Sequence, residues 1–556
     1  MFKPKLFSSL KGYNAKQLTN DIIAGVIVAI IALPLSIALA LASGVGPEEG
    51  LYTAIIAGFL ISFFGGSRVQ IAGPTAAFAT IVAGVVAKNG MQGLVLATVM
   101  AGILLILMGI FKLGSLIKFI PFTITTGFTA GIAVTILIGQ LKDFFGLTYP
   151  EGTVAIETVE KLEVFFHNIT TINPWAIVVG LVSLAILIVW PKIPVISKIP
   201  GSLIAVLVGI GMVQLGSLPV NTIGDLYSVS SKLPPLTIPT FDFGMIQAVL
   251  PDAFTIAVLA AIESLLSCVV ADGMVNSKHD SNTELIAQGI GNVGSALFGG
   301  IPATGAIART AANIKNGGRT PIAGIVHAIT LLLILVLLMP YAALIPMPVI
   351  AAILFHVAYN MCQWRPFVRL VKTAPLHDIF VLVLTFVLTV VFDLVVAIVV
   401  GIVLACILFM KRMSDESNVK SWSYIEQEPE DAAQLMMVPK GVRVYDITGP
   451  LFFGAADRIA DIVIKDYTKY LILRMNTVTA VDSTAMNALE KLGERCEANG
   501  VQIVFTHVGK QPMQAFEKAG FAQRIGKEHF YPHIEDAVAE INRKLENSEF
   551  ANMDAE

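Results

Sequence analysis

Charged residues are scarce in this chain, and the usual marks of an enzyme are missing. Only 14% of its 556 residues are Asp, Glu, Lys or Arg, whereas a soluble domain has roughly 25%. No P-loop, H-E-x-x-H or G-x-S-x-G motif occurs, and these motifs mark nucleotide hydrolases, zinc proteases and serine hydrolases. The net charge of -3 says little, because the sign and position of the charges matter more here than their total. We expect no catalysis, and no nucleic-acid partner.

Cysteine is rare as well. The chain has four cysteines, and Cys268, Cys362, Cys406 and Cys496 are far apart in the sequence. Without a C-x-x-C pair or a Cys/His cluster, the sequence supports neither a disulfide framework nor a zinc site. We expect no bound metal and no cofactor.

Apolar sequence is what the chain has in abundance, with 55% hydrophobic residues and a mean hydropathy of +0.77. A full transmembrane helix needs about 20 apolar residues, and on this basis we predict about fourteen segments in a polytopic membrane protein. They lie near 22–42, 51–65, 74–87, 91–111, 117–140, 174–190, 200–216, 250–271, 285–299, 303–314, 320–340, 343–361, 378–394 and 395–410. The last two come from one long run divided at Asp393, which we interpret as a cap or packing residue or, alternatively, as part of a solute pathway.

The composition changes after Arg412, where the chain becomes polar. Farther on, predicted strands at 442–447, 470–474 and 502–507 alternate with predicted helices at 455–465, 483–499, 511–519 and 533–544, which indicates a small α/β domain. The predicted organisation is a cytoplasmic N-terminal segment (1–20), a transmembrane domain (21–412), a linker (413–440), an α/β domain (441–546) and a polar tail (547–556).

The lysines and arginines of the predicted loops fall mostly on one side of the membrane. If the N-terminus is cytoplasmic, the loops on the other side hold only Lys88, Lys142, Lys161 and Lys232. Because cytoplasmic loops are enriched in these residues, we expect an even number of spans, both termini in the cytoplasm and a location in the cytoplasmic membrane.

Two segments, Gly65–Phe78 and Gly299–Arg309, interrupt apolar runs at matching places in the two halves of the chain. Each begins with a Gly-Gly pair at the end of a hydrophobic run and contains Gly, Pro and Thr. Broken helices at corresponding positions of two halves point to the binding site of a transporter, because irregular backbone at membrane depth is tolerated only in protein or beside a cavity.

We interpret Thr75 and Thr304 as starts of two half-helices, whose free N–H groups would face one pocket. Helix N-termini attract anions, and Arg309 would add a cation. The alternatives are that these segments are ordinary kinks or packing notches, and that Arg309 extends to the membrane surface.

Glu263 lies about halfway along an apolar segment, where an acidic residue is costly and indicates function. It is a candidate proton carrier or, with Ser267 one turn farther on, a Na⁺ ligand. The alternative is a permanent structural ion pair with Arg309. In the first span, Ser36 follows Pro34, which interrupts the hydrogen bonds of the helix. We expect Ser36 to line the same pocket or, alternatively, to pack at a contact between two helices.

Ser483 and Thr484 follow a predicted strand in the C-terminal domain. Either residue is suited to cap the next helix, and the alternative is that Ser483 is a regulatory phosphorylation site.

These features together resemble the sulfate permease (SulP) family of anion transporters, the bacterial relatives of the SLC26 carriers. The resemblance covers nearly the whole chain, and its markers are Ala32–Pro34, Gly50–Tyr52, Ser67–Ala77, Ala261–Leu266, Gly289–Asn292 and a C-terminal domain that resembles the STAS fold. It implies an α-helical membrane domain of fourteen segments in a seven-plus-seven inverted repeat, with core and gate domains. It also implies a cytoplasmic STAS domain and a homodimer.

The resemblance further implies that the anion binds between the third and tenth helices. In bicarbonate-carrying members the residues that match Glu263 and Ser267 coordinate Na⁺, but the acid here is Glu rather than Asp, which favours H⁺. Arg309 matches the basic residue of the family, and Ser483 matches the residue phosphorylated in stand-alone STAS proteins. The predicted substrate-binding residues are Ser36, Thr75, Ala76, Ala77, Phe78, Ala303, Thr304, Gly305 and Arg309.

The predicted function is proton-coupled uptake of a C4-dicarboxylate or sulfate by alternating access. The dicarboxylate is included because the sequence around Glu263 resembles that of a bacterial dicarboxylate-carrying member of the family. The first alternative is a Na⁺-coupled bicarbonate symporter. The second is an anion channel or sensor whose STAS domain signals to a cytoplasmic partner.

Overall fold

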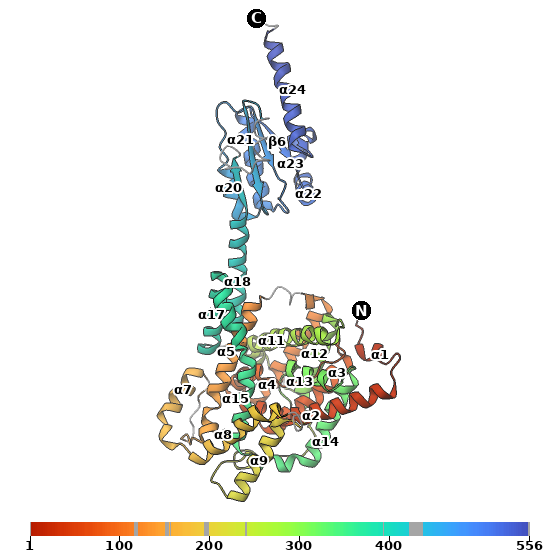
Figure 1. Cartoon of the computed structure of the whole chain (residues 1–556), viewed down its shortest axis with the longest axis vertical. Coiled ribbons are helices and arrows are strands. Elements are labelled where there is room, and N and C mark those ends of the chain that lie inside the picture. The colour runs from red at the N-terminus through yellow and green to blue at the C-terminus, as the bar shows by residue number, and fades with distance from the viewer. Residues whose placement is uncertain are drawn as a thin grey trace. The chain divides into compact units, whose positions relative to one another are not determined.

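A computed structural model describes residues 2–115, 121–150, 155, 157–193, 199–239, 242–392, 394–421 and 438–553. The chain forms two compact units, Met1–Val403 and Leu404–Glu556, and Figure 1 labels their elements. Asp393, where we predicted a break between two spans, and most of the predicted linker lie outside the described residues.

The first unit is almost entirely helical (Figure 1). Its helices are α1 (Lys5–Ser9), α2 (Ala15–Ala42), α3 (Pro47–Phe64), α4 (Ala79–Ile110), α5 (Phe122–Gly139), α6 (Leu141–Phe145), α7 (Thr158–His167), α8 (Pro174–Val189), α9 (Gly201–Gly216), α10 (Ile223–Leu226), α11 (Phe243–Val275), α12 (Ser281–Leu297), α13 (Ile307–Lys315), α14 (Ile322–Ala342), α15 (Met347–Cys362), α16 (Trp364–Thr373), α17 (Leu376–Val391) and the start of α18 (Leu394–Glu416). Two short strands, β1 (Ala72–Gly73) and β2 (Thr304–Gly305), and the 3-10 turns η1 (Ala76–Phe78), η3 (Ile169–Thr171) and η4 (Trp190–Lys192) lie between them.

Eight helical stretches in the described part of the chain are long and apolar enough to cross a membrane. They are Ala15–Ala42, Ala76–Ile110, Phe122–Phe145, Pro174–Lys192, Phe243–Val275, Ile322–Ala342, Met347–Thr373 and Val396–Glu416. Two shorter apolar helices, α9 and α17, do not reach the length of a full span. The count of fourteen segments therefore stays a prediction, whereas the helical membrane domain is confirmed.

The helix α4 contains a break at Gly90, whose φ of 63° lies in the left-handed region. This break separates the segments that we predicted at 74–87 and 91–111. Residues other than glycine would be strained in this conformation, so Gly90 marks where the half-helix that follows β1 ends.

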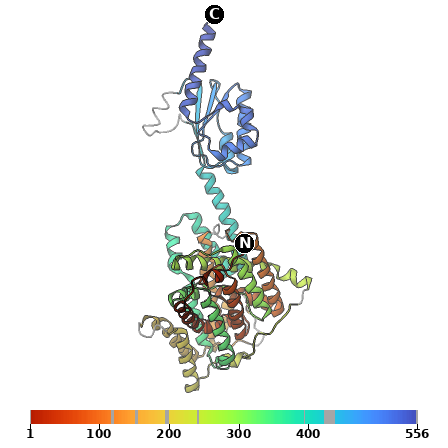
Figure 2. The ribbon, with the colours of Figure 1, turned by 90° about the vertical axis from the view of Figure 1, so that its right-hand side faces the viewer.

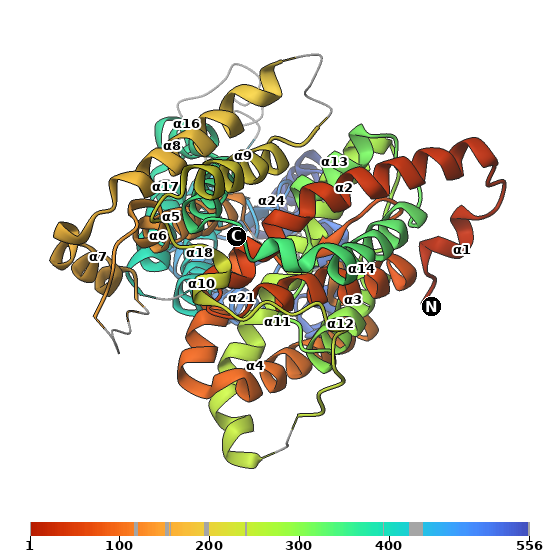
Figure 3. The same cartoon turned by 90° about the horizontal axis from the view of Figure 1, so that it is seen from below.

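The helices of the first unit pack in two groups, which Figure 3 shows side by side. In one group α12 packs on α3 and α4, α11 packs on α4, and α14 packs on α2 and α3. In the other group α15 and α17 pack on α5, and α8 packs on α9 and α15. Within the first group the order helix, helix, strand, helix occurs twice, as α2–α3–β1–α4 and as α11–α12–β2–α13. This arrangement matches the expected core and gate domains.

The second unit is an α/β domain with five strands in the order β3-β4-β5-β6-β7. The strands are β3 (Asn418–Ser421), β4 (Val442–Thr448), β5 (Tyr470–Arg474), β6 (Gln502–Thr506) and β7 (Phe530–Tyr531), and all neighbours are parallel except β3 and β4. The helical elements are η6 (Phe453–Ala455), α20 (Ala456–Ala460), α21 (Ser483–Ala498), α22 (Lys510–Lys518), α23 (Phe521–Ile525), η7 (Lys527–His529) and α24 (Ile534–Met553).

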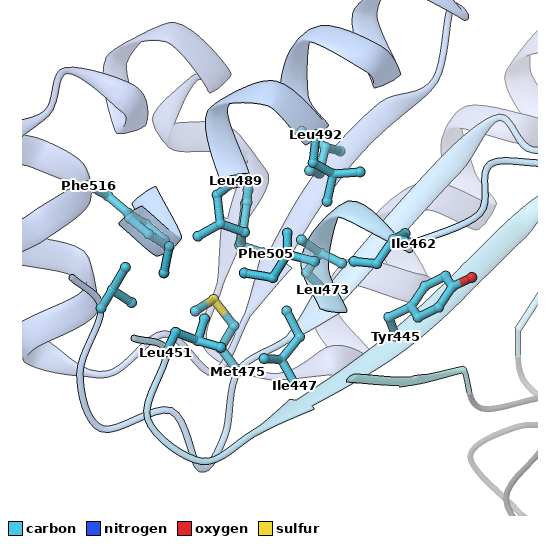
Figure 4. Close-up of a cluster of buried hydrophobic side chains, with 14 of the residues drawn as sticks. Tyr445, Ile447, Leu451, Ile462, Leu473, Met475, Leu489, Leu492, Phe505 and Phe516 are labelled. Carbon is cyan, nitrogen blue, oxygen red and sulfur yellow. The ribbon is translucent and has the colours of Figure 1, made fainter. Parts of the chain in front are cut away.

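Helices cover both faces of this sheet. Alternate strand residues point to opposite faces, and both faces carry apolar side chains that the helices bury. Leu473 and Phe505 pack against Leu489 of α21 on one face (Figure 4). Ile472 packs against Ile534 of α24 on the other face. In Figure 2 the strands of this unit lie between α24 and the remaining helices.

Three details of the second unit differ from the sequence prediction. β3 lies within the segment predicted as a linker, and its Val419 packs on the sheet core. The helix predicted at 455–465 ends at Ala460. β7 has only two residues and was not predicted. Strands this short have too little alternation to be detected in the sequence.

The close packing of α4 on α12 predicts a cost for any side chain at Gly289. A Cβ there would overlap the Gly102 carbonyl oxygen and come within 2.9 Å of the Ile106 nitrogen. We expect Gly289→Ala to lower the melting temperature of the purified protein, since overpacking costs about 1–3 kcal/mol. Gly211→Ala on α9 is the matched control, because that position has open space and alanine favours helix by about 1 kcal/mol. A Gly289→Ala protein as stable as the control would contradict this packing.

Candidate functional site

The two interrupted segments meet in the structure as an antiparallel strand pair. Ala72 of β1 pairs with Gly305 of β2, and Gly73 pairs with Thr304. The Ala306 amide also donates to the Ile71 carbonyl oxygen at 2.9 Å. Each strand leads into a helical element, η1 with α4 after β1 and α13 after β2. The prediction that these segments are interrupted and begin close together is confirmed.

Glycine is required in both strands because side chains from elsewhere fill the space beside them. A Cβ on Gly73 would overlap Nη1 of Arg309, and one on Gly305 would overlap the Gln70 side-chain amide. The strand pair therefore lies closely packed between Arg309 and Gln70.

The first residues of η1 and α13 offer backbone N–H groups, because the first turn of a helix has no acceptor within its own helix. Ala76, Ala77 and Phe78 are all buried, and only the Phe78 amide is recorded as donating locally, to the Thr75 carbonyl oxygen at 3.2 Å. On the β2 side, Ala303 is also buried. The pair of helix starts is thus a region rich in donors and of positive potential.

The prediction that a half-helix starts at each threonine is confirmed for Thr75 and wrong for Thr304. Thr304 lies in β2, and the N-cap of α13 is Ala306. Thr75 occupies the N-cap position of η1, but its side chain makes no capping bond. Strand pairing places Thr304 outside the helix. The Thr75 hydroxyl is hydrogen-bonded to Glu263.

Both threonines instead connect the strand pair to α11. The Thr75 hydroxyl donates to Oε2 of Glu263 at 2.8 Å, and the Thr304 hydroxyl donates to the Ala260 carbonyl oxygen at 3.0 Å. Ala260 and Glu263 are three residues apart on one helix, so they lie on the same face. Glu263 is therefore held at the start of η1, and it is half-buried there.

Arg309 is 1% exposed, which excludes the alternative that it extends to the membrane surface. Its Nη2 donates to the Pro74 carbonyl oxygen at 2.9 Å, whereas its Nε and Nη1 have no partner among the described residues. The ion pairs found in the described part of the chain include neither Arg309 nor Glu263, so the alternative of a permanent pair is wrong. A buried guanidinium with free N–H groups calls for a further acceptor.

Ser267 and Ser36 are buried but do not join Glu263 by a recorded hydrogen bond. The Ser267 hydroxyl donates to Oγ1 of Thr310 at 3.4 Å. Thr310 in turn accepts from the Ile71 amide at 3.0 Å. The Ser36 hydroxyl on α2 has no partner among the described residues, and α2 packs against α13.

Several residues that hold the strand pair were not predicted as part of the site. Asn292 of α12 accepts from the Ala303 amide at 2.8 Å and donates to its carbonyl oxygen at 2.9 Å. The Ile301 amide donates to Thr53 of α3 at 2.7 Å. Both are polar side chains within membrane segments, and this pattern in the sequence could have indicated their role.

In the second unit, Ser483 is the first residue of α21 and is exposed. The cap is Asp482, which accepts from the Ala485 amide at 2.8 Å and the Phe453 amide at 2.9 Å. The prediction that Ser483 or Thr484 caps this helix is therefore wrong, and the Ser483 hydroxyl faces solvent.

Comparison with known families identifies both units. The model of the sulfate permease family matches residues 18–385, and the model of the STAS domain matches residues 435–537.

Similar curated proteins cover nearly the whole chain. The chain is 40% identical to "Putative sulfate transporter YvdB" of Bacillus subtilis over 95% of its own length and 98% of that protein. It is 31% identical to the bicarbonate transporter BicA of Synechocystis sp. over 94% of each chain. These relatives are named as transporters and not as enzymes.

Solved structures show the same fold. The SLC26A9 structure aligns with a TM-score of 0.85 and 19% identity over 99% of this chain and 94% of that chain. The transmembrane domain of a cyanobacterial BicA aligns with a TM-score of 0.61 and 31% identity over 71% of this chain and 98% of that chain.

The overlap between Gly73 and Arg309 predicts the effect of a small substitution. In Gly73→Ala the new methyl group displaces the guanidinium from the Pro74 carbonyl oxygen. We expect the affinity of the purified protein for its anion to fall by about tenfold or more, equivalent to about 1.4 kcal/mol. Binding of radiolabelled sulfate, succinate and bicarbonate checks this. Gly84→Ala on α4, where a Cβ has open space, should bind normally, and an unchanged affinity in Gly73→Ala would rule out Arg309 as part of the site.

Proposed function

The chain belongs to the sulfate permease family of anion transporters, and we propose that it takes up an anion by proton-coupled alternating access. The observation that carries this proposal is the β1–β2 pair. Beside it lie two helix starts and a buried guanidinium that has no acidic partner among the residues that the structure describes. Its substrate in this proposal is sulfate or a C4-dicarboxylate.

Anion binding in this region is favourable only if several interactions combine. Moving a bare anion from water into hydrocarbon costs tens of kcal/mol, and each helix terminus returns only about 0.3–2 kcal/mol. The free N–H groups of Arg309 add charge-assisted hydrogen bonds, which are the stronger kind. Together with the amides of Ala76 and Ala77, they form a donor set for an oxyanion or carboxylate.

Glu263 is proposed to carry the coupled proton. Its carboxyl group accepts from Thr75 at the start of η1, so an ionised Glu263 places negative charge beside the proposed anion site. Like charges close together disfavour each other. Protonation of Glu263 then favours anion binding, and the proton and the anion move together.

Sodium coupling is the second candidate, because the chain is similar to bicarbonate transporters over almost its full length. In that mechanism Glu263 and Ser267 hold Na⁺, and bicarbonate is the substrate. The Ser267 hydroxyl donates a hydrogen bond to Thr310, so a sodium site requires the Ser267 side chain to rotate. This requirement makes the proton mechanism our preferred proposal.

We also propose a homodimer in the cytoplasmic membrane, as the family resemblance implies. Both termini lie in the cytoplasm in this proposal, as the distribution of lysine and arginine indicates. The STAS domain then faces the cytoplasm, where an exposed Ser483 is available to a kinase or a protein partner.

Replacing the proposed proton carrier tests the coupling. In liposomes with an imposed pH gradient, we expect Glu263→Gln to lose accumulation of the anion but to keep exchange of internal for external anion, since a permanently neutral side chain still permits binding. Glu494→Gln, an exposed site in the α/β domain, is the charge-matched control. Accumulation by Glu263→Gln that still follows the pH gradient would eliminate Glu263 as the carrier.

The same vesicles distinguish the two ions. Uptake that follows the pH gradient and is indifferent to sodium, in parent and in Ser267→Ala protein, supports the proton mechanism. Uptake that requires a sodium gradient and is lost in Ser267→Ala supports the second candidate.

Removing residues 440–556 tests what the STAS domain contributes. All residues of the proposed anion site precede Val403, in the first unit. We therefore expect a changed transport rate or abundance but the same order of preference in a panel of radiolabelled anions. A reordered panel would show that the STAS domain takes part in selecting the substrate.

A further inference from the structure

The helix α16 is set apart from the spans on either side of it. Gln363, with a φ of 46°, turns the chain sharply after α15. Ala374 is extended, and Pro375 precedes α17. None of the residues of α16 is buried, although the helix contacts α5. It is thus a short surface helix held at both ends by apolar helices, and Figure 3 labels it near α17.

The side chains of α16 form three stripes, because residues three and four apart share a face. Phe367 and Leu370 are half-buried, and the Phe367 ring lies 5.4 Å from that of Phe386 on α17. A second stripe is apolar but exposed, with Trp364 at 47%, Val368 at 37% and Val371 at 38%.

The third stripe is basic and consists of Arg365, Arg369 and Lys372, which repeat the spacing of the apolar stripe one residue later. No ion pair is recorded for these three side chains in the residues that the structure describes. The segment 363–377 contains no acidic residue, and the next one is Asp378 in the first turn of α17. The positive charge of this stripe is therefore uncompensated along α16.

We propose that α16 is a membrane-surface helix that binds the headgroups of anionic phospholipids. An exposed apolar stripe beside a basic stripe is the pattern of helices that lie in the membrane interface, and clusters of Lys and Arg there attract anionic lipids. Trp364 suits the depth of the headgroups. A lipid satisfies both stripes at once, since acyl chains cover the apolar one and the phosphate pairs with the basic one. An acidic soluble protein would satisfy only the second.

Quenching of Trp364 fluorescence by brominated lipids tests this directly. In the full chain, Trp175, Trp190 and Trp422 are replaced by Phe, so that Trp364 alone reports. Vesicles contain three parts phosphatidylcholine to one part phosphatidylglycerol, and the brominated lipid is either all of the phosphatidylglycerol or an equal amount of the phosphatidylcholine. We expect brominated phosphatidylglycerol to quench Trp364 more strongly than brominated phosphatidylcholine at the same mole fraction. Loss of all three cations in Arg365→Gln/Arg369→Gln/Lys372→Gln should remove this preference, since each Lys or Arg near an anionic surface contributes about 1 kcal/mol of attraction.

Two further variants separate this lipid site from general effects. Arg365→Lys/Arg369→Lys keeps the charge and should keep the preference. Lys3→Gln/Lys5→Gln/Lys11→Gln removes three positive charges from the N-terminal segment and should leave it intact. Equal quenching by both lipids in the parent, no quenching by either, or an undiminished preference in the triple α16 variant would overturn the proposal. The measurement needs no substrate, so its failure leaves the proposed transport function untouched.

Discussion

The whole site depends on how the chain satisfies its backbone hydrogen bonds where two membrane segments are interrupted. Exposed N–H and C=O groups are costly at this depth. The β1–β2 pair solves this by joining the two interruptions to each other. Asn292, Thr53 and Thr310 complete the arrangement by bonding the adjacent backbone. The helix starts that follow are consequently fixed close together.

The distribution of charge around this pair has a functional consequence. Arg309 donates to a backbone carbonyl oxygen, and Glu263 accepts from Thr75. If the two had formed an ion pair, the guanidinium would be neutralised, and an anion would have to displace a carboxylate. Because each is bonded elsewhere, the two charges do not neutralise each other, and in the proposed mechanism Arg309 is available to the anion and Glu263 to the proton.

The site also lies within one of the two groups of helices that pack in the first unit. The residues of β1, β2, η1, α11 and α13 belong to the group that contains α4 and α12. A solute held by this group moves with it if the groups rotate against each other, which is how many transporters achieve alternating access. The glycines between α4 and α12 keep this group closely packed and suited to move as one body.

The sequence by itself determined the class of protein, the α/β domain and the places where helices break, because hydropathy, glycine and proline act locally. It also identified Thr75, Thr304, Arg309 and Glu263 as unusual. It did not determine what these side chains bond to, so Thr304 was placed at a helix start instead of in a strand, and an ion pair between Arg309 and Glu263 stayed an alternative. Only the tertiary structure decided this, because strand pairing and the contacts of α11 join residues roughly two hundred positions apart, and no local pattern records such distances.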